Sequence, residues 1–78
     1  MTNTGVAAEE PGGITVNGSP EPHGPETVAA LLIAHDIDTG GRGIAVALNG
    51  RVVPRTAWAD TPIAPGDAVE IVRARPGG

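Results

Sequence analysis

The sequence contains no cysteine and no lysine, and Trp58 is its only Phe, Tyr or Trp residue. Without cysteine the chain has no disulfide, no thiolate metal ligand and no cysteine nucleophile. It also lacks any apolar run near the roughly 20 residues needed to cross a bilayer, so we expect no membrane partner. The apolar residues that are present are mostly Ala, Val, Ile and Leu. This composition favours β-branched strands around a small aliphatic core.

Positive charge is scarce as well. The 78 residues carry five arginines against nine acids, which gives a formal net charge of −4. Affinity for nucleic acid depends on clustered positive charge and on aromatic stacking surfaces, so we expect no nucleic-acid partner. The N-terminus has neither the basic region nor the apolar region of a signal peptide, and we therefore expect a cytoplasmic protein.

The length of the chain allows one small domain, because a chain of this size buries only about 60% of its unfolded surface. Residues 1–13 are polar, acidic and rich in Gly and Pro, without any period, which predicts a disordered N-terminal extension. We expect residues 14–75 to form the domain and residues 76–78 to form a flexible tail.

Two Asn-Gly dipeptides predict β-hairpins, because both residues of a type I′ turn need a positive φ. The arm that follows Asn17-Gly18 carries two prolines, so it is expected to be a short edge strand. Asn49-Gly50 separates alternating apolar residues from a short return, and Pro65-Gly66-Asp67 predicts a tight turn before the last strand. Residues 55–63 show no clean period and predict a turn or one helical loop. The strands are expected at residues 14–16, 19–23, 44–48, 51–53 and 68–73.

One helix is predicted between the two hairpins. Val28, Leu31 and Leu32 fall at positions i, i+3 and i+4 of one helical face, and His35 follows at i+7. Thr27 is expected to be the N-cap. The helix should run from residue 28 to residue 35 or 36.

Glycines at positions 40, 41 and 43 follow this helix and precede a strand. A phosphate-binding glycine loop lies between a strand and a following helix, so we interpret these glycines as a helix C-cap and a loop. The resulting order is β-β-α-β-β-β. Because one helix cannot cover both faces of a sheet, it should pack across one face only.

Candidates for conventional catalysis are few. Ser19 is the only serine, with His23 and His35 as possible partners, and a catalytic triad needs a rigid cleft that this core is hardly large enough to build. We interpret His23 as a solvated loop residue and His35 as a helix-end residue favourable to the helix dipole. Two histidines on separate elements do not make a specific metal site, so we expect neither a metal nor a cofactor.

The sequence ends on Gly77 and Gly78, directly after the last predicted strand. A C-terminal carboxylate is a poor electrophile, but coupling to AMP turns it into a mixed anhydride, from which a sulfur nucleophile can displace the AMP. Glycines, which lack Cβ, permit the close backbone approach that a partner's active-site channel demands. At about 7% Gly usage, chance gives such an ending in roughly one chain in two hundred, and more often in a Gly-rich chain.

Several segments together carry a family resemblance. They are I-T-V-N-G at 14–18, E-T-V-A-A-L-L at 26–32, A-L-N-G-R-V-V-P-R-T-A-W at 47–58, P-G-D-A-V-E-I at 65–71 and the closing G-G. With them the chain resembles the β-grasp (ubiquitin-like) fold and, more narrowly, the bacterial sulfur carriers of thiamine thiazole biosynthesis, the ThiS family. The resemblance implies an α+β fold, with a mixed sheet of four to five strands and one helix packed across one face. Residues 1–13 are expected to lie outside the family core.

The resemblance also implies a function, that of a co-substrate rather than an enzyme. Gly78 would be adenylated by an E1-like adenylyltransferase (ThiF-like), converted to a thiocarboxylate with sulfur from a donor such as a cysteine desulfurase, and used by thiazole synthase (ThiG-like). Gly77 would pass through the partner's channel, and Pro76 stiffens the tail where a more flexible residue is common. Arg73 and Arg75 would bind the partner's acidic rim, where charge mainly affects the on-rate. An equally supported interpretation is that these two arginines are ordinary solvated surface charges.

Two other functions remain open at this stage. One is a sulfur carrier for molybdopterin or another sulfur-transfer pathway, although the N-G-x-x-V-P-R-x-x-W block is usually missing from the molybdopterin carriers. The other is a ubiquitin-like interaction module without sulfur chemistry. The absence of lysine disfavours chain building through isopeptide bonds to this protein. For Trp58, packing in the core is the leading interpretation and contact with a partner is the alternative.

Overall fold

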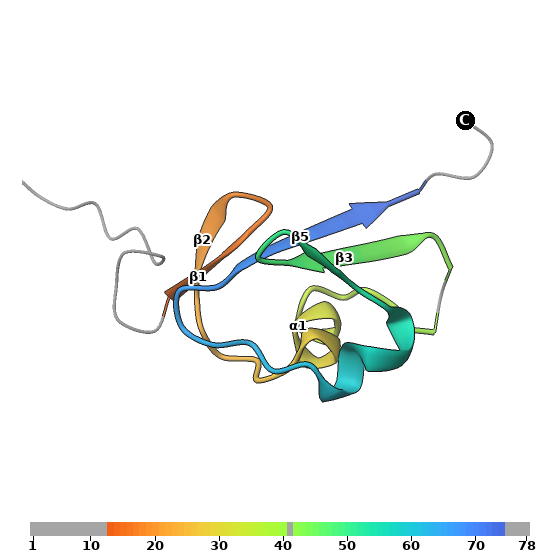
Figure 1. Ribbon diagram of the computed structural model, residues 1–78, viewed down its shortest axis with the longest axis horizontal. Helices are drawn as coiled ribbons and strands as arrows, with labels where there is room; N and C mark the ends of the chain where they lie inside the picture. The colour runs from red at the N-terminus through yellow and green to blue at the C-terminus, as the bar shows by residue number, and fades with distance from the viewer. Residues whose placement is uncertain (1–12, 41, 75–78) are drawn as a thin grey trace, which may run out of the picture.

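The computed structural model describes residues 13–40 and 42–74 (Figure 1). The elements are β1 (Gly13–Val16), β2 (Ser19–Pro22), α1 (Val28–Ala34), β3 (Ile44–Leu48), β4 (Arg51–Val53), the 3-10 helix η2 (Arg55–Asp60) and β5 (Ala68–Arg73). The predicted β-β-α-β-β-β order is confirmed, and η2 is the helical loop expected after β4. The predictions for residues 1–12 and for residues 75–78 lie outside the described part of the chain.

The five strands form one mixed sheet in the order β2-β1-β5-β3-β4. Strand β5 lies at the centre, parallel to β1 and antiparallel to β3. Strand β2 is at the edge, as its prolines predict, so the missing N–H groups of Pro20 and Pro22 cost no ladder hydrogen bond on the open side. Figure 1 shows α1 and η2 on the same side of the sheet, which confirms that the helix packs across one face.

The turns have the backbone geometry that their residues predict. Asn17 and Gly18 have φ of 52° and 82°, and Asn49 and Gly50 have φ of 52° and 83°. These positive values are those of a type I′ turn, whose twist matches that of the flanking strands. Gly66, in the turn before β5, has φ of 90°, where a side chain would be strained.

Helix α1 begins as predicted. The Thr27 hydroxyl accepts a hydrogen bond from the Ala30 backbone N–H at 3.1 Å and satisfies one of the unpaired donors of the first turn. Val28, Leu31 and Leu32 are buried against the sheet. The 3.6-residue period therefore identifies the buried face.

The end of α1 differs from the expectation. The helix ends at Ala34 with His35 as the C-cap residue, and the residue with positive φ that follows is Asp36, at 60°. The prediction that glycines at 40–43 form the C-cap is therefore wrong. Asp tolerates the left-handed region because its short polar side chain bonds locally. Gly43, with φ of 80°, instead lies against Ala74, the residue after β5, where an added Cβ would meet the Ala74 carbonyl oxygen at 3.3 Å.

The hydrophobic core lies between the sheet and the two helices. The side chain of Trp58, from η2, is only 3% exposed, and its Nε1–H donates to the Val53 carbonyl at 2.9 Å. Core packing is thus confirmed for Trp58. Among the described residues no polar or charged side chain is buried. The core consists of Ile14, Val16, Val28, Leu31, Leu32, Ile37, Val46, Val53, Trp58, Ile63, Val69 and Ile71.

Candidate functional site

Strand β5 leads toward the Gly-Gly end of the sequence, and its last residues are held by the β3 side of the sheet. Its last residue, Arg73, pairs with Ile44 of β3, and the Ala74 N–H donates to the Gly43 carbonyl at 2.6 Å. The chain is therefore bonded into the sheet as far as residue 74. Four of the predicted site residues, Arg75, Pro76, Gly77 and Gly78, lie outside the described residues.

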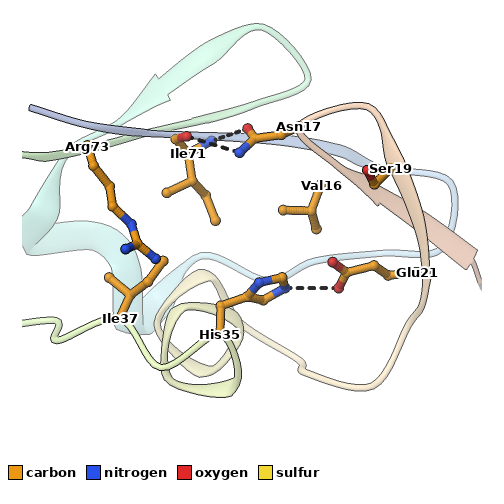
Figure 2. Close-up of a pocket in the computed structure, with 8 residues that line it drawn as sticks. All are labelled: Val16, Asn17, Ser19, Glu21, His35, Ile37, Ile71 and Arg73. Atoms are coloured by element: carbon orange, nitrogen blue, oxygen red, sulfur yellow. Dashed lines mark hydrogen bonds and ion pairs between the residues drawn. The ribbon is translucent and has the colours of Figure 1, made fainter.

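Alternation along β5 assigns its side chains to the two faces of the sheet. Val69 and Ile71 are buried on the helix side, and Arg73 continues this series because the side-chain period of a strand is two. Its guanidinium lies beyond the core, at the rim of the helix side, and Figure 2 shows it extending toward Ile37. Arg73 is exposed, and among the described residues it forms no ion pair with a carboxylate.

The opposite face of the sheet is open and carries two large apolar side chains. Val72 is 62% exposed and pairs with Ala45, while Val52 on edge strand β4 is 79% exposed and pairs with Ala47. Because Ala45 and Ala47 are two residues apart on β3, all four side chains lie on the same face. An apolar strip therefore runs across the open face beside the end of β5.

On the helix side, Arg73 borders a shallow depression of about 290 Å³ (Figure 2). The depression combines side chains from the first hairpin, from the end of α1 and from β5. The His35 Nε2 and the Glu21 Oε1 lie 3.0 Å apart across it, and their side chains are 32% and 29% exposed. The lining residues are Val16, Asn17, Ser19, Glu21, His35, Ile37, Ile71 and Arg73.

This depression tests the serine–histidine hypothesis directly. Ser19 and His35 both line it, but the His35 Nε2 is engaged by Glu21, and no hydrogen bond joins Ser19 to either histidine. The arrangement lacks the nucleophile–base hydrogen bond that activates a serine. Within the described residues it therefore offers a surface depression with a hydrogen-bonded His35–Glu21 pair rather than a triad.

The interpretation of His23 as a solvated loop residue is wrong. Its ring is half-buried, and the Nε2 lies 2.7 Å from the Ile63 carbonyl oxygen. Since a carbonyl only accepts, the Nε2 must carry the hydrogen and donate it. His23 thus ties the segment after β2 to the segment before β5. His35, by contrast, is the helix-end residue that the sequence predicts.

Within residues 13–40 and 42–74, no group of three or more His, Asp or Glu side chains is arranged to hold a metal ion. No helix in the same part of the chain is long and apolar enough to cross a membrane.

Sequence reasoning named Arg73 as a candidate but did not predict the residues that the fold brings beside it. Asn17 and Glu21 lie 56 and 52 positions before Arg73 in the sequence (73 − 17 and 73 − 21), yet all three line one depression. The parallel pairing of β1 with β5 causes this proximity. The cue was the ubiquitin-like strand order itself, because it places the first hairpin beside the last strand.

Comparison with known proteins bears on the whole chain. The ThiS family model matches residues 5–78. The crystal structure of the thiamine biosynthesis protein (ThiS) from Geobacter metallireducens is 35% identical, with a TM-score of 0.69 over 85% of this chain and 99% of that chain. The NMR solution structure of a thiamine biosynthesis protein from the same organism is 38% identical, with a TM-score of 0.69 over 85% of this chain and 87% of that one. A search of curated proteins gave no significant match.

These findings confirm the β-grasp fold. The family match begins at residue 5, within the segment that we expected from the sequence to lie outside the family core. At its other end the match includes both final glycines.

Proposed function

Because this chain belongs to the ThiS family, we propose that it is a sulfur carrier in thiamine thiazole biosynthesis whose reactive group is the carboxylate of Gly78. Adenylation by an E1-like adenylyltransferase (ThiF-like) consumes ATP, releases pyrophosphate and turns a poor electrophile into a mixed anhydride. A hydrosulfide equivalent, supplied by a donor such as a cysteine desulfurase, displaces AMP and leaves a thiocarboxylate. The thiocarboxylate then gives its sulfur to thiazole synthase (ThiG-like).

The observation that carries this proposal is the family match, which extends through Gly77 and Gly78. The fold is compatible with it, because β5 is the central strand and the reactive residues follow it in the sequence. In this role the protein is a cytoplasmic co-substrate, and the reaction chemistry belongs to the partner enzymes.

The proposal assigns partner binding to Arg73 and Arg75, with Pro76 and Gly77 in the partner's channel. Arg73 supports it by its position, since its exposed guanidinium lies at the rim of the sheet without a carboxylate partner among the described residues. On a protein of net charge −4, an isolated positive end of a strand gives an acidic partner a defined orientation.

The test is the intact mass of the protein after incubation with ATP, the adenylyltransferase and sodium hydrosulfide. We expect a mass gain equal to the difference between one sulfur and one oxygen atom. Deletion of Gly78 should abolish the gain, because the chain then ends on a carboxylate one residue too short. No gain with an enzyme that loads its own carrier would contradict the proposal and favour a ubiquitin-like interaction module.

The receiving pathway is tested separately. The loaded protein should support thiazole formation by thiazole synthase and should not support molybdopterin formation. The opposite result would assign it to a molybdopterin carrier role.

A further inference from the structure

The side chain of Asn17 binds both backbone groups of one residue of β5. Its Oδ1 accepts from the Ile71 N–H at 2.8 Å, and its Nδ2 donates to the Ile71 carbonyl at 3.2 Å. A side-chain amide has the same donor and acceptor groups as a peptide. Asn17 thus gives Ile71 the two hydrogen bonds that a residue of a neighbouring strand would give.

The ladder between β1 and β5 explains why Ile71 needs this partner. The two strands pair only at Thr15 with Ala68 and at Val16 with Val69. The Asn17 N–H still donates to the Val69 carbonyl at 2.8 Å, but the chain then turns away toward β2. Beyond that point the Asn17 side chain, rather than backbone, continues the contact with β5.

Asn49 is a close counterpart at the other end of the same strand. Its Oδ1 accepts from the Ala68 N–H at 2.9 Å, and its Nδ2 donates to the Asp67 carboxylate at 2.9 Å. The φ angles of the two Asn-Gly turns agree within one degree. One hairpin asparagine therefore holds the beginning of β5, and the other holds a point two residues before Arg73.

We propose that Asn17 is a positioning residue for sulfur loading, an inference that rests on the proposed function. By fixing Ile71 from the β1 side, it sets the direction in which the end of β5, Arg73 and the following residues are presented to the adenylyltransferase. Asn17 and Arg73 also line the same depression, so the Asn17–Ile71 hydrogen bonds lie near the guanidinium that is proposed to bind the partner. A preorganised strand end reduces the ordering cost of binding.

The matched pair of variants is Asn17→Gly and Asn49→Gly. Glycine keeps the positive φ of each turn and removes the side-chain hydrogen bonds. Asn17→Gly therefore loses the bonds to Ile71 near the end of β5, and Asn49→Gly loses the bond to Ala68 at its beginning. We expect Asn17→Gly to raise the KM for the carrier in the adenylyltransferase reaction about fivefold to tenfold, the effect of about one net hydrogen bond. We expect kcat to change little. Asn49→Gly should leave KM near the wild-type value at a comparable loss of stability.

Asn17→Asp provides a second variant if Asn17→Gly folds poorly. Aspartate tolerates the left-handed turn and still accepts from the Ile71 N–H, but it has no donor for the Ile71 carbonyl. Its second carboxylate oxygen would face the Ile71 carbonyl oxygen, and its negative charge would lie in the same depression as Arg73, so its KM should rise at least as far as that of Asn17→Gly. An Asn17→Asp KM equal to that of the wild type would overturn the inference.

Amide hydrogen exchange followed by NMR gives a readout that needs no partner enzyme. In Asn17→Gly, exchange at Ile71 should accelerate relative to that at Val46, which marks global opening in the core. Unchanged relative exchange would overturn the inference whether or not the protein is loaded with sulfur. If the wild type is loaded with sulfur but the two glycine variants show equal changes in KM, the positioning role alone is overturned. Failure to load the wild type would overturn the proposed function together with it.

Discussion

Individual polar side chains bind the loops of this domain to the backbone around the core. The core itself contains no polar residue among those described. The Trp58 ring donates to the Val53 carbonyl, and the His23 ring donates to the Ile63 carbonyl. Each bond joins a helix or loop to the backbone at the border of the core. In a domain that buries little surface, such bonds are a large share of the net stability.

The substitution Trp58→Phe tests how much this single side chain contributes to the free energy of unfolding. The substitution removes the donor to the Val53 carbonyl and part of the largest side chain in the core, so we expect a loss of about 1–3 kcal/mol in the free energy of unfolding. Urea denaturation followed by circular dichroism measures it. Ile33→Ala, at an exposed position on α1, is the control and should change stability by about 0.5 kcal/mol or less. Equal effects of the two substitutions would contradict the role of Trp58 in the core.

At the scale of elements, the two Asn-Gly turns bring both hairpins against β5. Gly50 has φ of 83° and no heavy atom within 4 Å of an added Cβ, whereas Gly24 has equally open space and no positive φ. Gly50→Ala should therefore destabilise the protein by about 1–2 kcal/mol through backbone strain alone. Gly24→Ala should have little effect or stabilise slightly by restricting the unfolded chain. Comparable unfolding midpoints for the two variants would show that the turn geometry contributes nothing.

The end of β5 carries the docking prediction. Replacing Arg73 and Arg75 by Glu should lower kcat/KM for adenylation, and the difference from the wild type should shrink as salt is raised, because screening weakens attraction to an acidic rim. Stopped-flow or initial-rate measurements at two ionic strengths measure it.

The matched control for this experiment changes the same charge elsewhere. Arg51 and Arg55 are exposed on β4 and η2, so their double replacement by Glu alters the net charge equally on elements other than β5. If both double variants lose the same activity, net charge rather than docking at β5 controls the rate.

At the scale of the whole molecule, local sequence signals predicted the elements and long-range pairing determined the site. Thr27, the period of Val28 and Leu31, and the two Asn-Gly dipeptides act within a few residues, so each was readable in the sequence. The Asn17–Ile71 bonds join residues 54 positions apart, and the contact depends on strand register, which a local pattern does not fix. The helix end was misread because an aspartate took the position that glycine usually occupies.

The whole fold also explains why the candidate site carries so little chemistry of its own. One face of the sheet is covered by α1 and η2, and the other presents Val52, Val72, Glu70 and small residues. The depression beside Arg73 holds a His35–Glu21 pair without an activated nucleophile. These features agree with the proposed function, in which partner enzymes recognise the domain and act on Gly78.

The most direct test of the sulfur-carrier function locates the sulfur within the chain. After incubation with ATP, adenylyltransferase and sodium hydrosulfide, the protein is cleaved and its C-terminal peptide is fragmented by mass spectrometry. We predict that the oxygen-to-sulfur exchange is found in every fragment that contains Gly78 and in no fragment that ends at Gly77 or earlier. An unchanged C-terminal peptide, or sulfur bound at another residue, would contradict the account.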